Sequence, residues 1–124
     1  MEIGAKSTST LVVTEQLTAA VMGSGDLPVL ATPAMIALME NAAMKAVAAA
    51  LPDDQTTVGS LMNASHLKPT AVGDTVSATA TLVAIEGRKL TFRVEALDSE
   101  GTIGEGDHVR YIVSREKFLA KLKK

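Results

Sequence analysis

Three residues whose side chains do acid–base or nucleophilic chemistry stand out in the sequence: Thr32, Glu40 and His66. Glu40 is a lone carboxylate in the run LATPAMIALMENAAMKAVAAA (30–50), which is otherwise almost entirely Ala, Met, Leu, Ile and Val. Burying an unpaired carboxylate is costly, so such a group usually shifts its pKa or acquires a partner. A lone helical Glu more often reaches water or a distant cation. The apolar context nevertheless makes Glu40 a candidate for catalysis.

Thr32 and His66 have structural explanations as well as chemical ones. Thr32 precedes Pro33, and this pair predicts a helix start, with Thr as the N-cap and Pro at the first helical position. The start of a long helix also favours a carbonyl oxygen or an anion, because unpaired N–H groups collect there. His66 ends a predicted strand, where a single His, like His108 further on, is more often a surface or hydrogen-bonding residue than a catalyst.

The elements that must position these residues are one long helix and about five strands. The helix is predicted to run from Thr32 to about Ala50, where the LPDD run stops it. Residues 115–124 are expected to form a brief amphipathic helix or a frayed tail. Short separators predict that the last three strands form an antiparallel meander. Alternating apolar residues predict the strands themselves at 7–16, 56–67, 72–85, 88–97 and 102–114.

The helix is apolar around more than one face, so it needs a neighbour on two sides. A sheet wrapped along the helix, in an α+β layer, would cover one side, and a dimer interface or a ligand cleft would cover the other. Gly59, Gly104 and Gly106 lie in predicted strands, where glycine marks a bulge, a close backbone approach or merely a bend. Arg88 and Lys89 sit at a hairpin and could bind phosphates, although such charges are more often solvated turns.

Composition excludes several classes of function. A net charge of −2 and only three aromatic residues offer no basic footprint and no stacking platform for nucleic acid. The absence of cysteine excludes thiol nucleophiles and thiolate zinc sites, and the sequence shows no metal-ligand spacing. The first ten residues lack an apolar signal core, and residues 30–51 are too often polar for a membrane span. We therefore expect one cytoplasmic domain over residues 1–124.

Together these pieces resemble the hot-dog fold, in which a curved antiparallel sheet wraps a long central helix. ATPAMIALMENAAMKAV is similar to the helix of the fluoroacetyl-CoA thioesterase-like branch, which has Thr at its start and Glu further along. GSLMNASHLKPTAVGDTV is similar to the strand of that branch that ends in a catalytic His. The separations of 8 residues from Thr32 to Glu40 and 26 from Glu40 to His66 match it too. VAIEGRKLTFRVEALD and IGEGDHVRYIVSREKFLAKL extend the resemblance over roughly residues 10–123.

The resemblance implies an acyl-CoA thioesterase that hydrolyses a small or medium acyl-CoA to free acid and CoA. It implies a homodimer, with a tetramer left open, and no metal or cofactor other than the CoA of the substrate. Glu40 would be the nucleophile or the base for water, Thr32 would orient it or the attacking group, and His66 would act as acid, base or orienting partner. The backbone N–H of Gly59 would stabilise the oxyanion. Arg88 and Lys89 are the candidates for binding the CoA phosphates.

The loop before the helix departs from the branch. The fluoroacetyl-specific enzyme carries aromatic residues in the loop and lid before its helix, whereas SGDLPVLATP contains none. We therefore expect the same catalytic residues with a different acyl pocket, built from the aliphatic side chains of Leu27, Val29, Leu30, Met35 and Met39.

Two other functions fit the same residues. An acyl-CoA hydratase or dehydratase would also use a His and an acidic residue beside the thioester, and it would leave the thioester intact. A non-catalytic acyl-CoA sensor would show thermal stabilisation by ligand without thiol release. Which subunit supplies each catalytic residue is left open at this point.

Overall fold

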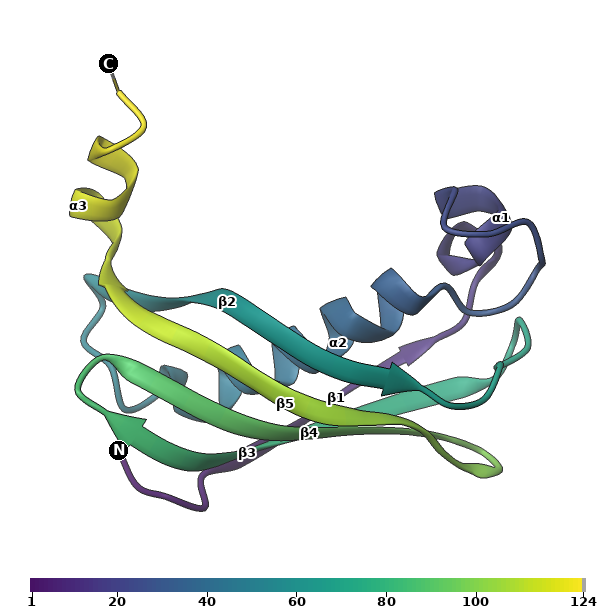
Figure 1. Cartoon of the computed structure of the whole chain (residues 1–124), viewed down its shortest axis with the longest axis horizontal. Helices are drawn as coiled ribbons and strands as arrows, with labels where there is room; N and C mark the ends of the chain where they lie inside the picture. The colour runs from purple at the N-terminus through teal and green to yellow at the C-terminus, as the bar shows by residue number, and fades with distance from the viewer. Residues whose placement is uncertain (124) are drawn as a thin grey trace.

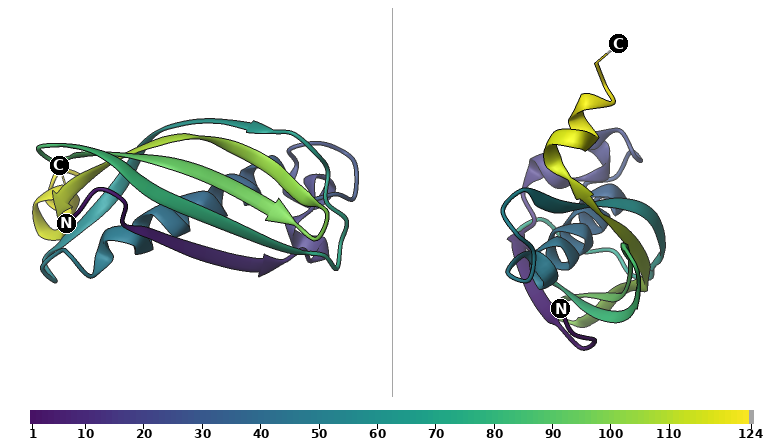
Figure 2. Two further views of the ribbon diagram at one scale, coloured as in Figure 1. Left: turned by 90° about the horizontal axis from the view of Figure 1, so that it is seen from below. Right: turned by 90° about the vertical axis from the view of Figure 1, so that its left-hand side faces the viewer.

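The computed structural model describes residues 1–123 of the chain. A five-stranded sheet curls along one long helix, α2 (Thr32–Ala48), which lies against its concave side (Figures 1 and 2). The predicted arrangement of a central helix wrapped by a curved antiparallel sheet is therefore what the chain adopts.

The strands agree with the periodicity of the sequence to within a few residues. Their order is β1-β3-β4-β5-β2, and every neighbouring pair is antiparallel, so β3, β4 and β5 form the predicted meander. Strands β1 and β2 are the two edges of the sheet. The strands are β1 (Lys6–Val12), β2 (Gln55–His66), β3 (Thr75–Glu86), β4 (Lys89–Asp98) and β5 (Gly101–Ser114), and the short helices are η1 (Glu15–Leu17), α1 (Ala19–Met22) and α3 (Arg115–Ala120).

The start of α2 differs by one residue from the prediction. Ala31 is the N-cap and makes no side-chain cap bond, and Thr32 is already the first helical residue, with Pro33 behind it in the first turn. Proline is favoured there because the amide that it lacks has no partner within the helix. The prediction of Thr32 as N-cap was wrong, since its hydroxyl contacts a strand instead.

The core lies between α2 and the inward-facing residues of the sheet. Small side chains on α2, among them Ala42 and Ala43, are fully buried, so the sheet approaches the helix closely. Alternate residues of the strands face the helix because side chains alternate across a sheet. The buried residues of β3 and β4 are Val76, Ala78, Ala80, Leu82, Leu90, Phe92, Val94 and Ala96.

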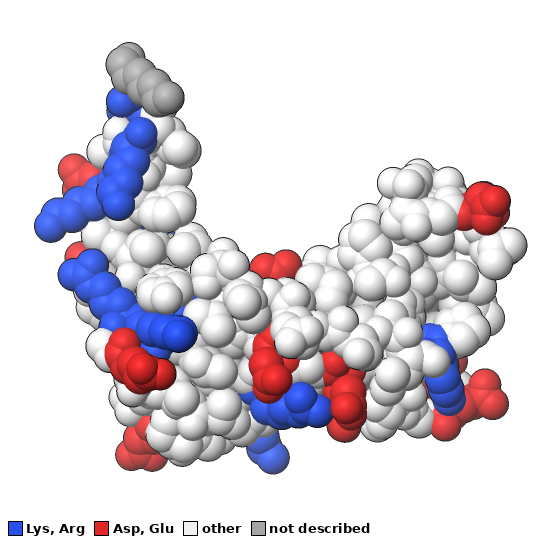
Figure 3. All heavy atoms as spheres, viewed as in Figure 1, with Lys and Arg blue, Asp and Glu red and all other residues white. Residues whose placement is uncertain are grey.

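The short helices α1 and α3 project from opposite ends of the molecule toward the same side, leaving a saddle along the edge strand β2 (Figure 1). Most of this saddle is uncharged on the face shown in Figure 3, whereas Lys and Arg side chains gather on and below α3. Within residues 1–123, each helix is too short or too polar to cross a membrane.

Candidate active site

Thr32 and His66 meet at one end of the molecule. Thr32 begins α2 and His66 ends β2, and the fold brings these two ends together. Thr32 Oγ1 lies 2.7 Å from His66 Nδ1. A neutral imidazole accepts at the nitrogen that carries no proton, so the Thr32 hydroxyl donates to Nδ1 when the ring proton is on Nε2. Contact of this kind between a hydroxyl and a base is what activates a nucleophile.

The surroundings of His66 favour its neutral form. Burial is the main cause that lowers the pKa of His66 below its usual 6.5, and a weaker contribution from the Lys68 backbone opposes the shift. Its Nε2 atom is buried and has no hydrogen-bond partner among the described residues. Buried polar atoms are nearly always paired, so this nitrogen is available to a ligand.

A pocket of about 270 Å³ opens beside this pair. Its lining includes Val29 and Leu30 from the segment before α2, and Lys68 from the segment after β2. Thr32 is exposed while Leu30 is buried. The hydroxyl is thus accessible from the pocket beside an apolar wall.

Glu40 lies further along α2 and has a different partner. Eight residues of α-helix separate it from Thr32 by about 12 Å along the axis. Glu40 Oε2 lies 3.7 Å from Arg110 Nη1, with side chains that are 42% and 7% exposed, respectively. Within one chain, therefore, Thr32 contacts His66 and does not orient Glu40. The half-exposed carboxylate of Glu40 lies next to the buried guanidinium of Arg110.

Arg110 is held by its neighbours on β2 and β5. Its Nε donates to Thr57 Oγ1 at 2.8 Å, and its Nη2 donates to the Thr57 carbonyl oxygen at 2.9 Å. His108 Nδ1 lies 2.7 Å from the Leu61 carbonyl oxygen, to which it can only donate, so His108 Nε2 accepts from Arg110 Nη1 at 3.2 Å.

This network leaves Glu40 as the anion that faces the guanidinium. Burial is the main cause that lowers the pKa of His108 below its usual value, and the charge of Arg110 adds to this shift. Burial also lowers the pKa of Arg110, while the neighbouring Glu40 opposes that shift. A neutral His108 therefore adds no positive charge to the network.

Gly59 leaves the space that this network occupies. A Cβ atom added at Gly59 would lie 2.8 Å from Glu40 Oε2, 3.3 Å from His108 Cε1 and 3.4 Å from Arg110 Nη1. Gly59 is paired with Arg110 on β5, next to an irregularity in the β2–β5 register between residues 59 and 61. The sequence left a bulge, a close backbone approach or a bend as explanations for Gly59. The structure shows side chains close to its backbone, beside a bulge.

Comparison with known proteins places the chain in a family. Residues 13–116 match the model of the family described as fluoroacetyl-CoA-specific thioesterase. A curated relative, the fluoroacetyl-CoA thioesterase of Streptantibioticus cattleyicolor, is 40% identical over 95 residues, which cover 77% of this chain and 68% of the relative. This chain belongs to the fluoroacetyl-CoA-specific thioesterase family.

Solved structures confirm the hot-dog fold for this member of the family. A structure of the fluoroacetyl-CoA thioesterase is 35% identical, covers 99% of this chain and 96% of that one, and has a TM-score of 0.92. A thioesterase superfamily member from Thermus thermophilus is 30% identical, covers 98% of this chain and 90% of its own, and has a TM-score of 0.90.

The acyl pocket expected for this family member is only partly assembled in the single chain. Val29 and Leu30 line the pocket beside Thr32. Met35 and Met39 are fully buried in the helix–sheet core, and Leu27 is 63% exposed. Met35 and Met39 do not line this pocket, and their part in binding the acyl group stays a prediction.

Of the two consecutive cations proposed for the CoA phosphates, one lines a pocket. Arg88 lies at the β3–β4 hairpin and lines a second pocket beside α3, whereas Lys89, the first residue of β4, is not part of that lining. This pocket also contains Lys117 and Lys121, which the sequence did not single out.

Arg110 is the residue of the site that sequence reasoning missed. Gly106, His108 and Arg110 are all buried and occupy alternate positions of β5, so the period-two pattern carried the signal. Arginine is rarely buried, so without a known partner for Arg110 the period-two pattern was not enough to predict its burial. Among residues 1–123, no group of three or more His, Cys, Asp or Glu side chains is arranged to hold a metal ion.

Proposed function

We propose that this chain hydrolyses a small or medium acyl-CoA to free acid and CoA, using Thr32, Glu40 and His66. As a member of this family, the chain is an acyl-CoA thioesterase and thus a thioester hydrolase. A variant of the fluoroacetyl-CoA thioesterase solved in complex with acetyl-CoA is 34% identical to this chain, with a TM-score of 0.93. The observation that carries the assignment of residues is the 2.7 Å contact between Thr32 Oγ1 and His66 Nδ1.

In this proposal, Thr32 is the nucleophile and His66 is its base. His66 Nδ1 takes the hydroxyl proton while Thr32 Oγ1 bonds to the thioester carbonyl carbon. The carbon–sulfur bond then breaks, and the CoA sulfur leaves with the proton from His66 as a thiol. Water then attacks the acyl ester of Thr32 and gives one proton to its base. The carbon–oxygen bond to Thr32 breaks, and Thr32 Oγ1 takes up that proton, which restores the hydroxyl. The CoA thiolate is a good leaving group, so positioning supplies much of the catalysis.

Glu40 and Gly59 would reach the same thioester across a dimer interface. Glu40 would act as base for the hydrolytic water, with Arg110 Nη1 3.7 Å from its Oε2, and the Gly59 N–H would stabilise the oxyanion. The 12 Å helical separation from Thr32 is too long for both residues of one chain to touch one carbonyl group. The buried, unpaired Nε2 of His66 also points to a site completed by a second chain.

The free edge of β2 is the surface that supports a homodimer. It is 12 residues long, QTTVGSLMNASH, and contains no Lys, Arg, Asp, Glu or Pro to block pairing with another strand. Native proteins usually protect such an edge or pair it. Leu61, in the middle of β2, is 52% exposed. Two β2 strands paired antiparallel would bury this edge in one continuous sheet.

The proposal also includes a cytoplasmic location and a need for no cofactor beyond the CoA of the substrate. A cysteine-free chain is compatible with a reducing compartment. The loop 24–33 contains no aromatic residue, so we propose that the acyl preference differs from fluoroacetyl. Whether dimers pair into tetramers is left to solution measurement of mass.

The first experiment measures thiol release from short, branched and aromatic acyl-CoAs by the wild type, Thr32→Ala and Glu40→Gln. We expect turnover of at least one substrate, and a loss of about 100-fold or more in each variant. Melting temperatures serve as the control for folding. Release of thiol at the wild-type rate by both variants would overturn the assignment of the site, and addition of water to an intact thioester would indicate a hydratase.

A second experiment tests the shared site. Thr32→Ala and Glu40→Gln subunits are co-expressed with different tags, and the hybrid dimer is purified on both. If the residues act across the interface, one of the two sites contains no mutation, and the hybrid recovers about half of the wild-type activity. If both residues act within one chain, each site carries a mutation and the hybrid is inactive.

A further inference from the structure

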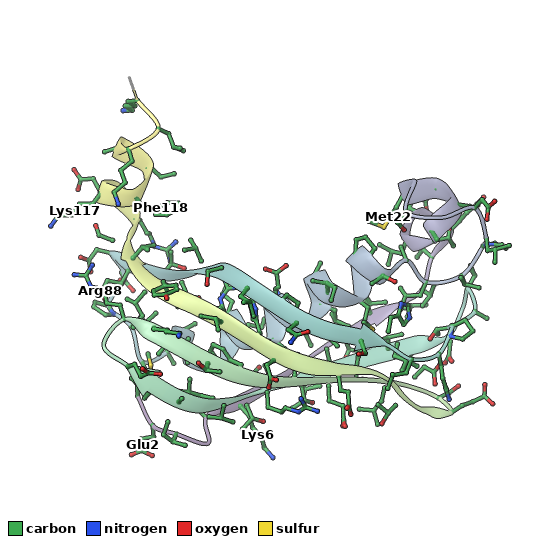
Figure 4. The ribbon with its side chains drawn as sticks, viewed as in Figure 1. Glu2, Lys6, Met22, Arg88, Lys117 and Phe118 are labelled. Atoms are coloured by element: carbon green, nitrogen blue, oxygen red, sulfur yellow. The ribbon has the colours of Figure 1, made fainter. Side chains whose placement is uncertain are left out.

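A second groove lies at the end of the molecule away from Thr32 and His66. It has a volume of about 330 Å³ and is lined by α3, the C-terminal part of β5, the β3–β4 hairpin and the start of β2. We call it the α3 groove. Figure 4 shows Arg88 of the hairpin below Lys117 and Phe118 of α3.

The α3 groove is rich in unneutralised positive charge. Three cations, Arg88, Lys117 and Lys121, line it against one carboxylate, Asp54. Within residues 1–123, the ion pairs are made by Arg93 and Arg110, and none joins a cation of the groove to a carboxylate. Cations that converge without a counter-charge form a favourable site for phosphate groups.

The groove also offers an aromatic surface. Phe118, one of only three aromatic residues in the chain, is part of the lining and is 38% exposed. Every nucleobase has a π-face that stacks on an aromatic ring. Phosphate-binding cations beside an exposed ring match the chemistry of a phosphorylated adenosine, which is the end of CoA remote from its thiol.

Backbone contacts fix the walls of this groove. The Ser114 side chain caps α3 at Lys117 N, and the Arg115 N–H donates to the Asp54 carbonyl oxygen at 2.9 Å. On the other wall, the Ile112 N–H donates to the Arg88 carbonyl oxygen, also at 2.9 Å. The cations therefore extend from anchored backbone, which reduces the entropy lost when a ligand binds.

The α3 groove is too far from Thr32 and His66 to serve them within one chain. Gln55 at the groove and His66 at the catalytic pocket are the two ends of β2. Eleven residue steps along a strand span about 36 Å, which is longer than the pantetheine arm of CoA. Antiparallel pairing that places the partner subunit's Gly59 opposite His66 would place the partner's Gln55, and with it the partner's α3 groove, four residue steps or about 13 Å beyond His66. The pantetheine arm can span that distance.

We infer that the α3 groove of one subunit binds the phosphates and adenine of a CoA whose thioester lies at Thr32 and His66 of the other subunit. This inference rests on the proposed thioesterase function and on the β2–β2 dimer. It assigns Arg88, Lys117 and Lys121 to the phosphates and Phe118 to the adenine.

The first test removes the three cations. The variant Arg88→Ala/Lys117→Ala/Lys121→Ala is compared with Lys6→Ala/Lys45→Ala/Arg93→Ala, which removes the same charge from exposed positions outside the groove. Each protein is assayed with the best acyl-CoA of the panel and with the matching acyl-pantetheine, which lacks phosphates and adenine. We expect the groove variant to raise the KM for acyl-CoA about tenfold or more, with kcat unchanged. Its kinetics with acyl-pantetheine should match those of the wild type.

The outcomes separate the alternatives. An unchanged KM for acyl-CoA would overturn the inference. Equal losses with both substrates would show a structural effect and would also overturn it. Adenosine 3′,5′-bisphosphate serves as a probe independent of turnover, and it should bind the wild type but not the groove variant in calorimetry. If it binds without competing with acyl-CoA, the groove is a separate nucleotide site and the inference is wrong.

The hybrid-dimer method tests which subunit supplies the groove. Thr32→Ala is paired with the groove triple variant, so that each hybrid has one intact Thr32 and one intact groove, on different chains. Binding across the interface predicts the wild-type KM for acyl-CoA at half the wild-type kcat. Binding within one chain predicts the raised KM of the triple variant and would overturn that part of the inference.

Discussion

Glu40 and Arg110 form an ion pair with unequal burial: the guanidinium side chain is 7% exposed and the carboxylate side chain 42%, with 3.7 Å between Oε2 and Nη1. Arg110 is also fixed by Thr57 and His108, whereas the ion pair with Arg110 is the polar contact that Glu40 makes among the described residues. The two members of the pair should therefore contribute very differently to folding.

Arg110→Met should destabilise the protein much more than Glu40→Gln. Replacing Arg110 leaves the buried Thr57 carbonyl and His108 Nε2 without a donor, at about 2 kcal/mol or more. Replacing Glu40 removes the half-exposed partner and should cost about 1 kcal/mol or less. Urea unfolding at pH 7 measures both values. Equal costs would contradict the unequal burial of the pair.

The pH dependence of activity should report a base, His66, whose pKa lies below 6.5. Burial lowers the pKa of His66 from its usual 6.5, so His66 remains a proton acceptor at neutral pH. The rate kcat/KM should fall only as the pH drops below 6.5. NMR titration of the two histidine rings, assigned with a His108→Gln variant, identifies which group is responsible. A His66 titration midpoint above 6.5 would contradict the assignment.

The same shifts affect the stability of the fold. The pKa values of His66 and His108 are both lowered, so the unfolded chain binds protons more readily than the folded one. The free energy of unfolding should be highest above pH 6.5 and should decrease as the pH falls below that value. Urea midpoints measured between pH 5 and pH 7.5 test this sign, and a midpoint that rises on acidification would refute it.

Gly59→Ala should displace Glu40 without changing any charge. The new methyl group would come within 2.8 Å of Oε2, which can move because Glu40 is half-exposed. We expect turnover to fall about tenfold or more, since 1.4 kcal/mol of misplaced interaction is a factor of ten, with a small change in melting temperature. Ser60→Ala, at the exposed neighbouring position, is the matched control. Wild-type turnover in Gly59→Ala would show that the position of the Glu40 carboxylate is unimportant.

Leu61→Glu should disrupt assembly at the β2 edge. Leu61 is 52% exposed in the middle of an uncharged strand, and a charge there would be buried in a β2–β2 interface. We expect a monomer in analytical ultracentrifugation, with loss of thiol release. Val83→Glu is the control, because Val83 is 46% exposed on β3, which β4 and β5 separate from β2. A dimer that survives Leu61→Glu would place the interface elsewhere.

The sequence was sufficient for the architecture because periodicity reports burial directly. Strands β3 and β4 bury every second residue from Val76 to Leu82 and from Leu90 to Ala96. The stop at Pro52 ends the helix within a few residues of its predicted end. The exact start of α2 was missed, because Thr32 can cap a helix or contact a strand. Only the approach of His66 decides between these roles.

The site was harder to predict because its contacts join distant segments. Thr32 and His66 are 34 residues apart and meet only because a helix start and a strand end share one end of the fold. Their pairing with Glu40 came from resemblance, and within one chain Glu40 faces Arg110 instead. In the proposed dimer the partners of Glu40 would come from a second chain, and no pattern along one chain reports such contacts.

Because Met35 packs against β5, oxidation of its sulfur atom should require the helix to separate from the sheet. Met35 is fully buried, and its Sδ occupies the space where a side chain at Gly104 would otherwise lie. Oxidation to the sulfoxide adds a polar oxygen for which the closed structure has no room. Peroxide should therefore modify the exposed Met22 and Met44 first. The slower oxidation of Met35 would then measure how often the helix separates from the sheet.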